Sequence, residues 1–372
     1  MSRRSTAVAA AAALACTAAA VAFATAQSAV ADPPPGEVVQ VPVTFSVENV
    51  NRSVVECGAD GLRYDVAGTL TAPAGALDDP GRAVTLYQHG IAGGEWYWNL
   101  PTDDPGLRGY NHVVEMAERG HVSVSIDRLG YDDSGVPPGV ETCIGAQADV
   151  TNQIVGQLRD GGYTGGERPA FGKVVLAGQS NGGLIANLTA VSFGGVDGLS
   201  VHGWGDLGFT PEADERFLAA TGRCLMQFAP GAAPGVAAGS ATGAPAEVPP
   251  GYTYYDDGTE EFLTGNFADA EQAVLDAVVP LQNAHPCGDM STITLGIYED
   301  LQRLDEVAVP VHVVHGEADE RIQGIEVQSG LYAGAQVDEL VVPGAGHYMG
   351  LERGAPLVHD DMAAWLTDNG LV

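Results

Sequence analysis

A serine between two glycines lies near the centre of the sequence. Residues 178–182 read Gly-Gln-Ser-Asn-Gly, after the apolar run 174–177 and before the apolar segment 184–191. A serine on a sharp strand-to-helix turn has an exposed Oγ, and flanking glycines avoid collisions across the turn. A serine hydroxyl becomes a strong nucleophile only when a base takes its proton. The pattern therefore predicts Ser180 as a catalytic nucleophile.

A base and an acid follow Ser180 in the chain. His347 lies in the glycine loop 344–347, directly after a strand predicted at 337–342, and Asp319 follows a strand predicted at 310–315. The order Ser, acid, His is one of those in which such triads occur. We expect His347 to accept the serine proton and Asp319 to orient its imidazole. Asp206, after a strand predicted at 199–204, is the competing acid.

Two backbone N–H groups are expected to bind the oxyanion that such a nucleophile generates. One belongs to Asn181, directly after the nucleophile. The other belongs to Ile91, in the glycine-containing loop 89–94 that follows a strand predicted at 83–87. Gly90 permits the backbone to bend toward the serine.

Aromatic and acidic clusters near these residues allow two interpretations each. Trp96, Tyr97 and Trp98 follow the loop of Ile91 and form either an aromatic wall of a substrate pocket or part of the core. The acidic pairs at 103–104 and 132–133 suggest turns rather than a metal site, because paired acids in turns are usually solvated. We expect no metal and no cofactor.

Strand-like and helix-like segments alternate along most of the chain, which is typical of an α/β fold with a doubly wound, mostly parallel sheet. Segments 39–47 and 62–71 predict an antiparallel hairpin. Parallel strands follow at 83–87, 122–126, 174–177, 199–204, 310–315 and 337–342, with helices at 111–119, 146–159, 184–191, 325–332 and 358–367.

The alternation stops between about residues 208 and 306. This stretch contains a Pro-, Gly- and Ala-rich segment at 229–251, five aromatic residues between 252 and 267, and an amphipathic helix predicted at 269–283. A long insertion in a regular sheet suggests a lid over a ligand site. We therefore expect core segments at 32–207 and 307–372, with a lid or cap at 208–306.

The first 31 residues resemble a secretory signal peptide. Arg3 and Arg4 precede a long alanine-rich apolar run, which ends in two candidate cleavage sites, after Ala26 and after Ala31. A membrane anchor is the alternative, but alanine is weakly apolar and prolines follow at once at 33–35. The prediction is an exported protein that is secreted after cleavage, with no stable membrane insertion.

Four cysteines remain after the predicted cleavage, and none has a C-x-x-C spacing. An even number in an oxidising compartment predicts two disulfides. Of the three pairings, we favour Cys57–Cys143 in the core and Cys224–Cys287 in the insertion, because a proline- and glycine-rich lid most needs a covalent tie.

The sequence is strongly acidic, with 16 Lys and Arg residues against 48 Asp and Glu residues and a formal net charge of −32. Loss of Arg3 and Arg4 leaves 14 basic residues and a charge of 14 − 48 = −34. Such a chain repels nucleic acids and anionic membranes. The expected partner is a small-molecule substrate, and the expected state is a monomer.

Taken together, the motifs resemble the α/β-hydrolase superfamily, and most closely its secreted bacterial esterases and lipases. The similarity covers residues 82–208 and 307–372 and rests on His89-Gly90, residues 127–135, the serine turn, residues 315–319 and Gly346-His347. It implies hydrolysis of a carboxylic ester or lactone through an acyl-serine intermediate. A peptidase or amidase with the same triad, and a non-catalytic binding protein on this scaffold, remain alternatives.

Overall fold

The structure is a computed structural model that describes residues 37–79, 81–101, 104–166, 168–227, 236–237 and 246–372. The predicted signal peptide and most of the Pro-, Gly- and Ala-rich segment lie outside the described residues. None of the described helices is long and apolar enough to cross a membrane.

An eight-stranded sheet forms the centre of the fold, in the order β1-β2-β4-β3-β5-β6-β11-β12. The first two strands form the predicted antiparallel hairpin, β2 is also antiparallel to β4, and all further neighbours are parallel. The strands are β1 (Val38–Glu48), β2 (Arg63–Pro73), β3 (Ala83–Gln88), β4 (Ser123–Ile126), β5 (Lys173–Gln179), β6 (Gly198–His202), β11 (Val311–Gly316) and β12 (Val337–Val342).

The central strands are buried on both faces, as expected for parallel strands covered by helices. All six residues of β3 are buried. Because side chains alternate along a strand, Leu86 and Tyr87 face opposite ways. Leu86 joins an apolar cluster with Leu158, while Tyr87 packs against Trp98. Such burial of one large apolar side chain stabilises the fold by about 1.5–3 kcal/mol.

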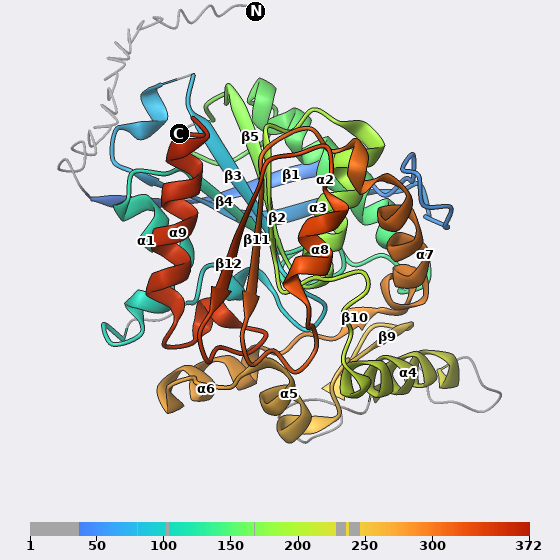
Figure 1. Ribbon diagram of the computed structural model, residues 1–372. Coiled ribbons are helices and arrows are strands. Elements are labelled where there is room, and N and C mark those ends of the chain that lie inside the picture. Colours follow the sequence, from blue (N-terminus) through green and yellow to red (C-terminus); the bar gives the residue numbers. More distant parts are fainter. Residues whose placement is uncertain (1–36, 80, 102–103, 167, 228–235, 238–245) are drawn as a thin grey trace, which may run out of the picture. The chain divides into compact units, whose positions relative to one another are not determined.

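Helices cover both sides of this sheet. In Figure 1, α1 and α9 lie together on one side, while α2 and α3 lie on the other. This arrangement confirms the predicted doubly wound α/β fold. The helices are α1 (His112–Glu118), α2 (Ile144–Asp160), α3 (Asn181–Phe193), α8 (Ile325–Leu331) and α9 (Ala355–Asp368).

The segment between β6 and β11 contains more helix than the sequence suggested. Figure 1 shows α4, α5 and α6 beyond the edge of the sheet where β11 and β12 end. The predicted helix 269–283 is shorter, because α6 ends at Val278 and a 3₁₀ turn follows. The elements are α4 (Pro211–Met226), β7 (Val236–Ala237), β8 (Ala246–Glu247), β9 (Tyr252–Thr253), α5 (Gly258–Asn266), α6 (Gln272–Val278), β10 (His285–Pro286) and α7 (Cys287–Arg303).

Candidate active site

Ser180 occupies a strained turn between β5 and α3. Its φ of 55° and ψ of −130° lie outside the regions that L residues commonly adopt, which costs on the order of 1–3 kcal/mol. A Cβ on Gly178 would approach the carbonyl oxygen of Gly182 to 2.1 Å, and one on Gly182 would approach that of His89 to 2.6 Å. Both glycines are therefore required by close backbone contacts. The Ser180 N–H donates to the His202 carbonyl at 2.8 Å and fixes the turn.

His347 and Asp319 form a buried hydrogen-bonded pair beyond β12 and β11. Asp319 Oδ2 lies 2.8 Å from His347 Nδ1. Its other oxygen, Oδ1, accepts from the backbone N–H groups of Arg321 at 2.7 Å and Ile322 at 3.1 Å. Burial raises the pKa of Asp319. The charge and hydrogen bond of His347, together with these two N–H groups, lower it by more, so the pKa lies below its ordinary value. The carboxyl group therefore stays ionised.

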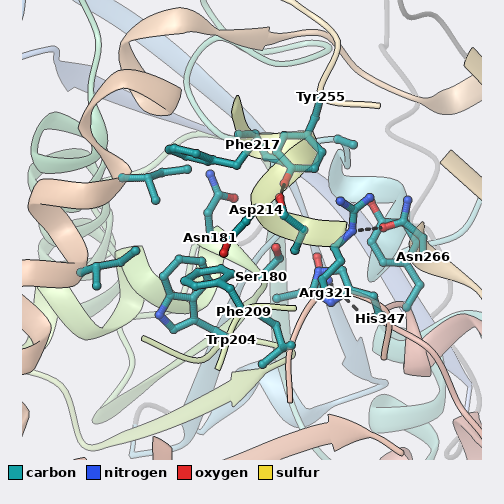
Figure 2. Close-up of a pocket in the computed structure, with 18 of the residues that line it drawn as sticks. Ser180, Asn181, Trp204, Phe209, Asp214, Phe217, Tyr255, Asn266, Arg321 and His347 are labelled. Atoms are coloured by element: carbon teal, nitrogen blue, oxygen red, sulfur yellow. Dashed lines mark hydrogen bonds between the residues drawn. The ribbon is translucent and has the colours of Figure 1, made fainter. Parts of the chain in front are cut away.

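The hydrogen bond to an ionised carboxylate also determines the tautomer of His347. Because a carboxylate only accepts, Nδ1 carries the proton and the Nε2 of the neutral ring is left as an acceptor. Nε2 is buried and has no hydrogen-bond partner in the described part of the chain. Ser180 and His347 line the same cavity, as Figure 2 shows.

Asp206, the competing acid, lies elsewhere in the hydrogen-bond network. It accepts from Trp204 Nε1 at 3.0 Å and from Gln328 Nε2 at 2.9 Å. Burial raises its pKa to about 7. The structure thus brings Asp319, and not Asp206, to the imidazole of His347.

The predicted oxyanion donors also line the cavity of Ser180. Asn181 is the first residue of α3, so its N–H has no acceptor within the helix. A Cβ on Gly90 would lie 2.9 Å from the Cβ of Ser180, which shows how closely the loop of Ile91 approaches the serine. The Gly90 carbonyl accepts from Arg128 Nη2 at 3.4 Å. In a trans peptide the N–H and the preceding carbonyl point in opposite directions, so the Ile91 N–H points away from the side on which the Gly90 carbonyl contacts Arg128.

Arg128 contacts both of the segments that carry the predicted oxyanion donors, the loop of Ile91 and the start of α3. It was not predicted as a site residue from the sequence. Its side chain is 1% exposed and donates to Asn181 Oδ1 at 3.3 Å as well as to Gly90. An ion pair of 3.2 Å with the fully buried Asp289 balances its charge and ties it to α7. Its position two residues after β4 did not indicate this role, because the partner carboxylate comes from 161 residues further along the chain.

The cavity has a volume of about 230 Å³ and largely apolar walls. In Figure 2, Phe217 and Tyr255 lie at the top of the view and Trp204 near the bottom. The inserted segment contributes residues from α4, α5 and α7. The lining residues are Ile91, Ala92, Gln179, Ser180, Asn181, Trp204, Phe209, Ala213, Asp214, Phe217, Tyr255, Asn266, Ile293, Thr294, Ile297, Arg321, Ile322, His347 and Tyr348.

Trp96, Tyr97 and Trp98 do not line this cavity, contrary to their first interpretation as a substrate wall. They are 5%, 1% and 1% exposed and belong to the apolar core. Trp98 donates from Nε1 to the Gln88 carbonyl at 3.0 Å. Because their large rings pack inside the fold, the structure supports the core-packing interpretation of these residues.

Both disulfides of the structure join the cysteines paired in the sequence analysis. Cys57, between β1 and β2, is bonded to Cys143, the residue before α2. Cys224 of α4 is bonded to Cys287, the first residue of α7. In the described chain, no group of three or more His, Cys, Asp or Glu side chains could hold a metal ion.

Sequence comparison assigns most of this chain to one protein family. Residues 84–360, more than half of the chain, match the profile of the alpha/beta hydrolase family. No curated protein sequence matches the chain.

Several solved structures share the fold at low sequence identity. A thermophilic esterase from Thermogutta terrifontis, solved with malate bound, has a TM-score of 0.58 at 18% identity over 87% of this chain and 99% of that chain. An esterase from Exiguobacterium antarcticum has a TM-score of 0.54 at 17% identity over 85% and 98%. A bromoperoxidase from Bacillus anthracis has a TM-score of 0.54 at 14% identity over 87% and 99%. Since their names differ in activity, these structures support the fold alone.

Proposed function

Because this chain belongs to the alpha/beta hydrolase family, we propose that it is an exported serine hydrolase that cleaves carboxylic esters or lactones through an acyl-serine intermediate. One observation carries the proposal: Ser180 shares a cavity with His347, whose Nδ1 is bonded to an ionised Asp319 and whose Nε2 is unpartnered among the described residues. This is the arrangement that a serine nucleophile needs.

In the acylation step, His347 Nε2 takes the Ser180 proton while Oγ bonds to the ester carbonyl carbon. The negative charge moves to the carbonyl oxygen, where the N–H groups of Ile91 and Asn181 stabilise it. Collapse of the tetrahedral intermediate breaks the bond to the alcohol, which receives the proton from His347. Water then repeats the sequence on the acyl-serine, releases the acid and restores Ser180.

The insertion at 208–306 is part of this proposal as a lid that selects substrates. It supplies Phe217 from α4 and Ile293 and Ile297 from α7 to the cavity wall. Apolar walls of this kind favour an uncharged, partly apolar acyl or alcohol group. The signal peptide predicted at 1–31 and the two disulfides support export, since disulfides persist in oxidising compartments.

A substrate panel tests the reaction class. Purified protein is assayed with p-nitrophenyl esters of graded acyl length, with lactones, and with the p-nitroanilides of the same acyl groups. We expect turnover of esters or lactones and much slower turnover of anilides. Faster anilide hydrolysis would assign a peptidase or amidase, and no hydrolysis of any substrate would favour a binding protein.

A further inference from the structure

One charged side chain in the cavity wall has no role in the steps above. Arg321 lies two residues beyond Asp319, and its backbone N–H supports that carboxylate. Its side chain is 7% exposed. In Figure 2 the guanidinium lies beside Asn266, on the side of the cavity that also holds His347. The loop after β11 thus gives one group to the triad and a second to the substrate cavity.

The hydrogen bonds of this guanidinium are incomplete. Nη2 donates to both carboxylate oxygens of Asp256, at 2.7 and 3.0 Å, and Nε donates to Asn266 Oδ1 at 3.3 Å. The planar group also lies over the ring of Tyr255, 4.8 Å from its centroid. Nη1 is buried without an acceptor in the described part of the chain. A buried donor without a partner is costly, so an acceptor supplied by a ligand would be favourable.

The charges around Arg321 identify the kind of acceptor. Arg321 and Arg216, 3.9 Å from Asp256, are two cations that share this fully buried carboxylate. The exposed Asp214 also lines the cavity, so its wall carries a second carboxylate. With no local excess of positive charge and a net charge of −32 on the chain, an anionic ligand is not favoured.

We propose that Arg321 is a specificity-determining residue that donates a hydrogen bond from Nη1 to an uncharged substrate oxygen outside the scissile ester. The preferred substrates are then esters with a second acceptor, such as a keto or ether oxygen. This inference rests on the proposed ester hydrolysis. It adds one claim to that proposal: the enzyme prefers an ester with the extra oxygen over an ester with a methylene at the same position.

Matched ester pairs test the preference on either side of the scissile bond. On the acyl side, p-nitrophenyl levulinate is compared with p-nitrophenyl valerate. On the alcohol side, methoxyethyl butyrate is compared with butyl butyrate by acid release. We expect kcat/KM to favour the oxygen-bearing ester by about ten- to hundredfold in one pair. Mono-p-nitrophenyl succinate adds a charged acceptor, and we expect it to react more slowly than the levulinate.

Two variants link the preference to Arg321. Arg321→Met with Asp256→Asn removes the donor without leaving a buried carboxylate unpaired, while Arg321→Lys keeps the charge for Asp256 but changes the donor geometry. Each should reduce the ratio of kcat/KM between the paired esters toward one. Arg216→Met is the matched control, because Arg216 contacts the same carboxylate but does not line the cavity. It should keep the ratio.

The outcomes separate this inference from the proposed function. Ester hydrolysis without any preference in the wild-type protein would overturn the role of Arg321 and leave the hydrolase assignment standing. Preference for the succinate would overturn the choice of an uncharged acceptor. A preference that survives in a folded Arg321 variant would place the selective contact elsewhere. If no ester is hydrolysed, both proposals fail.

Discussion

At the scale of single residues, the two oxygens of Asp319 have different partners. Oδ2 contacts His347, while Oδ1 is held by the N–H groups of Arg321 and Ile322. The carboxylate therefore cannot rotate without losing several hydrogen bonds. In the proposed mechanism, this rigidity holds His347 in the tautomer that can accept the Ser180 proton.

Replacing the acid is predicted to cost far more than replacing its competitor. Asp319→Asn should lower kcat for an ester by about 10³–10⁴, because the amide favours the wrong tautomer of His347. Asp206→Asn should have a much smaller effect, since Asp206 bonds to Trp204 and Gln328 instead. Steady-state kinetics of both variants, with melting temperatures to confirm folding, measure the difference. A larger loss in Asp206→Asn would assign the acid to the loop after β6.

Sequence patterns located some residues of the candidate site and not others. Ser180, His347 and Asp319 follow strands in a recognisable order, so their positions could be predicted from local sequence. Arg128 and Arg321 could not, because each is identified by its burial against a carboxylate. Asp289 and Asp256 are distant in sequence and become partners only when the insertion folds back.

At the scale of elements, the sheet was more predictable than the insertion. The strand predicted at 174–177 lies within β5 (Lys173–Gln179), since a buried apolar run bounded by glycine has few alternatives. Helices α4 and α7 were not predicted, although Thr210 and Pro211 are a typical helix start and the Thr210 hydroxyl accepts from the Ala213 N–H. The neighbouring glycine- and proline-rich segment led to the prediction of an irregular insertion instead.

The disulfide between α4 and α7 should stabilise the position of the cavity wall more than that of the sheet. It joins Cys224 and Cys287, 63 residues apart, and α4 and α7 carry Phe217 and Ile293 to the cavity. Replacing both cysteines by serine should remove up to about 4 kcal/mol in the chain-entropy treatment. We expect KM for bulky esters to rise more than KM for short ones.

Kinetics with two ester sizes and thermal melts measure this effect. The matched control replaces Cys57 and Cys143, neither of which lines the cavity. It should lower the melting temperature without changing the relative KM of the two esters. An equal change in relative KM for both double variants would refute a specific link between the α4–α7 disulfide and the cavity.

At the scale of the whole molecule, a buried hydrogen-bond chain joins several elements. Gln328 of α8 donates from Nε2 to Asp206 at 2.9 Å and to the Tyr332 hydroxyl at 3.4 Å. That hydroxyl donates to Asn187 of α3 at 2.8 Å, and Asn187 donates to Asp300 of α7 at 2.8 Å. Burial raises the pKa of Asp300 well above its ordinary value, and the charge of Asp206 raises it further. The chain thus links two carboxyl groups with raised pKa.

Global stability should therefore depend on the ionisation of Asp206. Its folded-state pKa of about 7 exceeds its unfolded value of about 3.9, so the fold favours the protonated form. The resulting stability is present below pH 4 and is lost as the pH rises through 7. Asp206→Asn does not titrate, so its free energy of unfolding should rise relative to that of the wild type as the pH increases from 4 to 7. Urea unfolding at several pH values measures this, and a pH-independent difference would contradict it.

The central claim, that Ser180 is the nucleophile, is tested most directly by mass spectrometry after reaction with a fluorophosphonate. This reagent bonds covalently to a serine whose proton is taken by a neighbouring base. We predict an adduct on the Ser180 peptide alone, inactivation in proportion to labelling, and neither labelling nor turnover in Ser180→Ala, whose kcat should fall by about 10⁴–10⁶. An adduct on another residue, or a folded Ser180→Ala variant that still hydrolyses esters, would contradict the account.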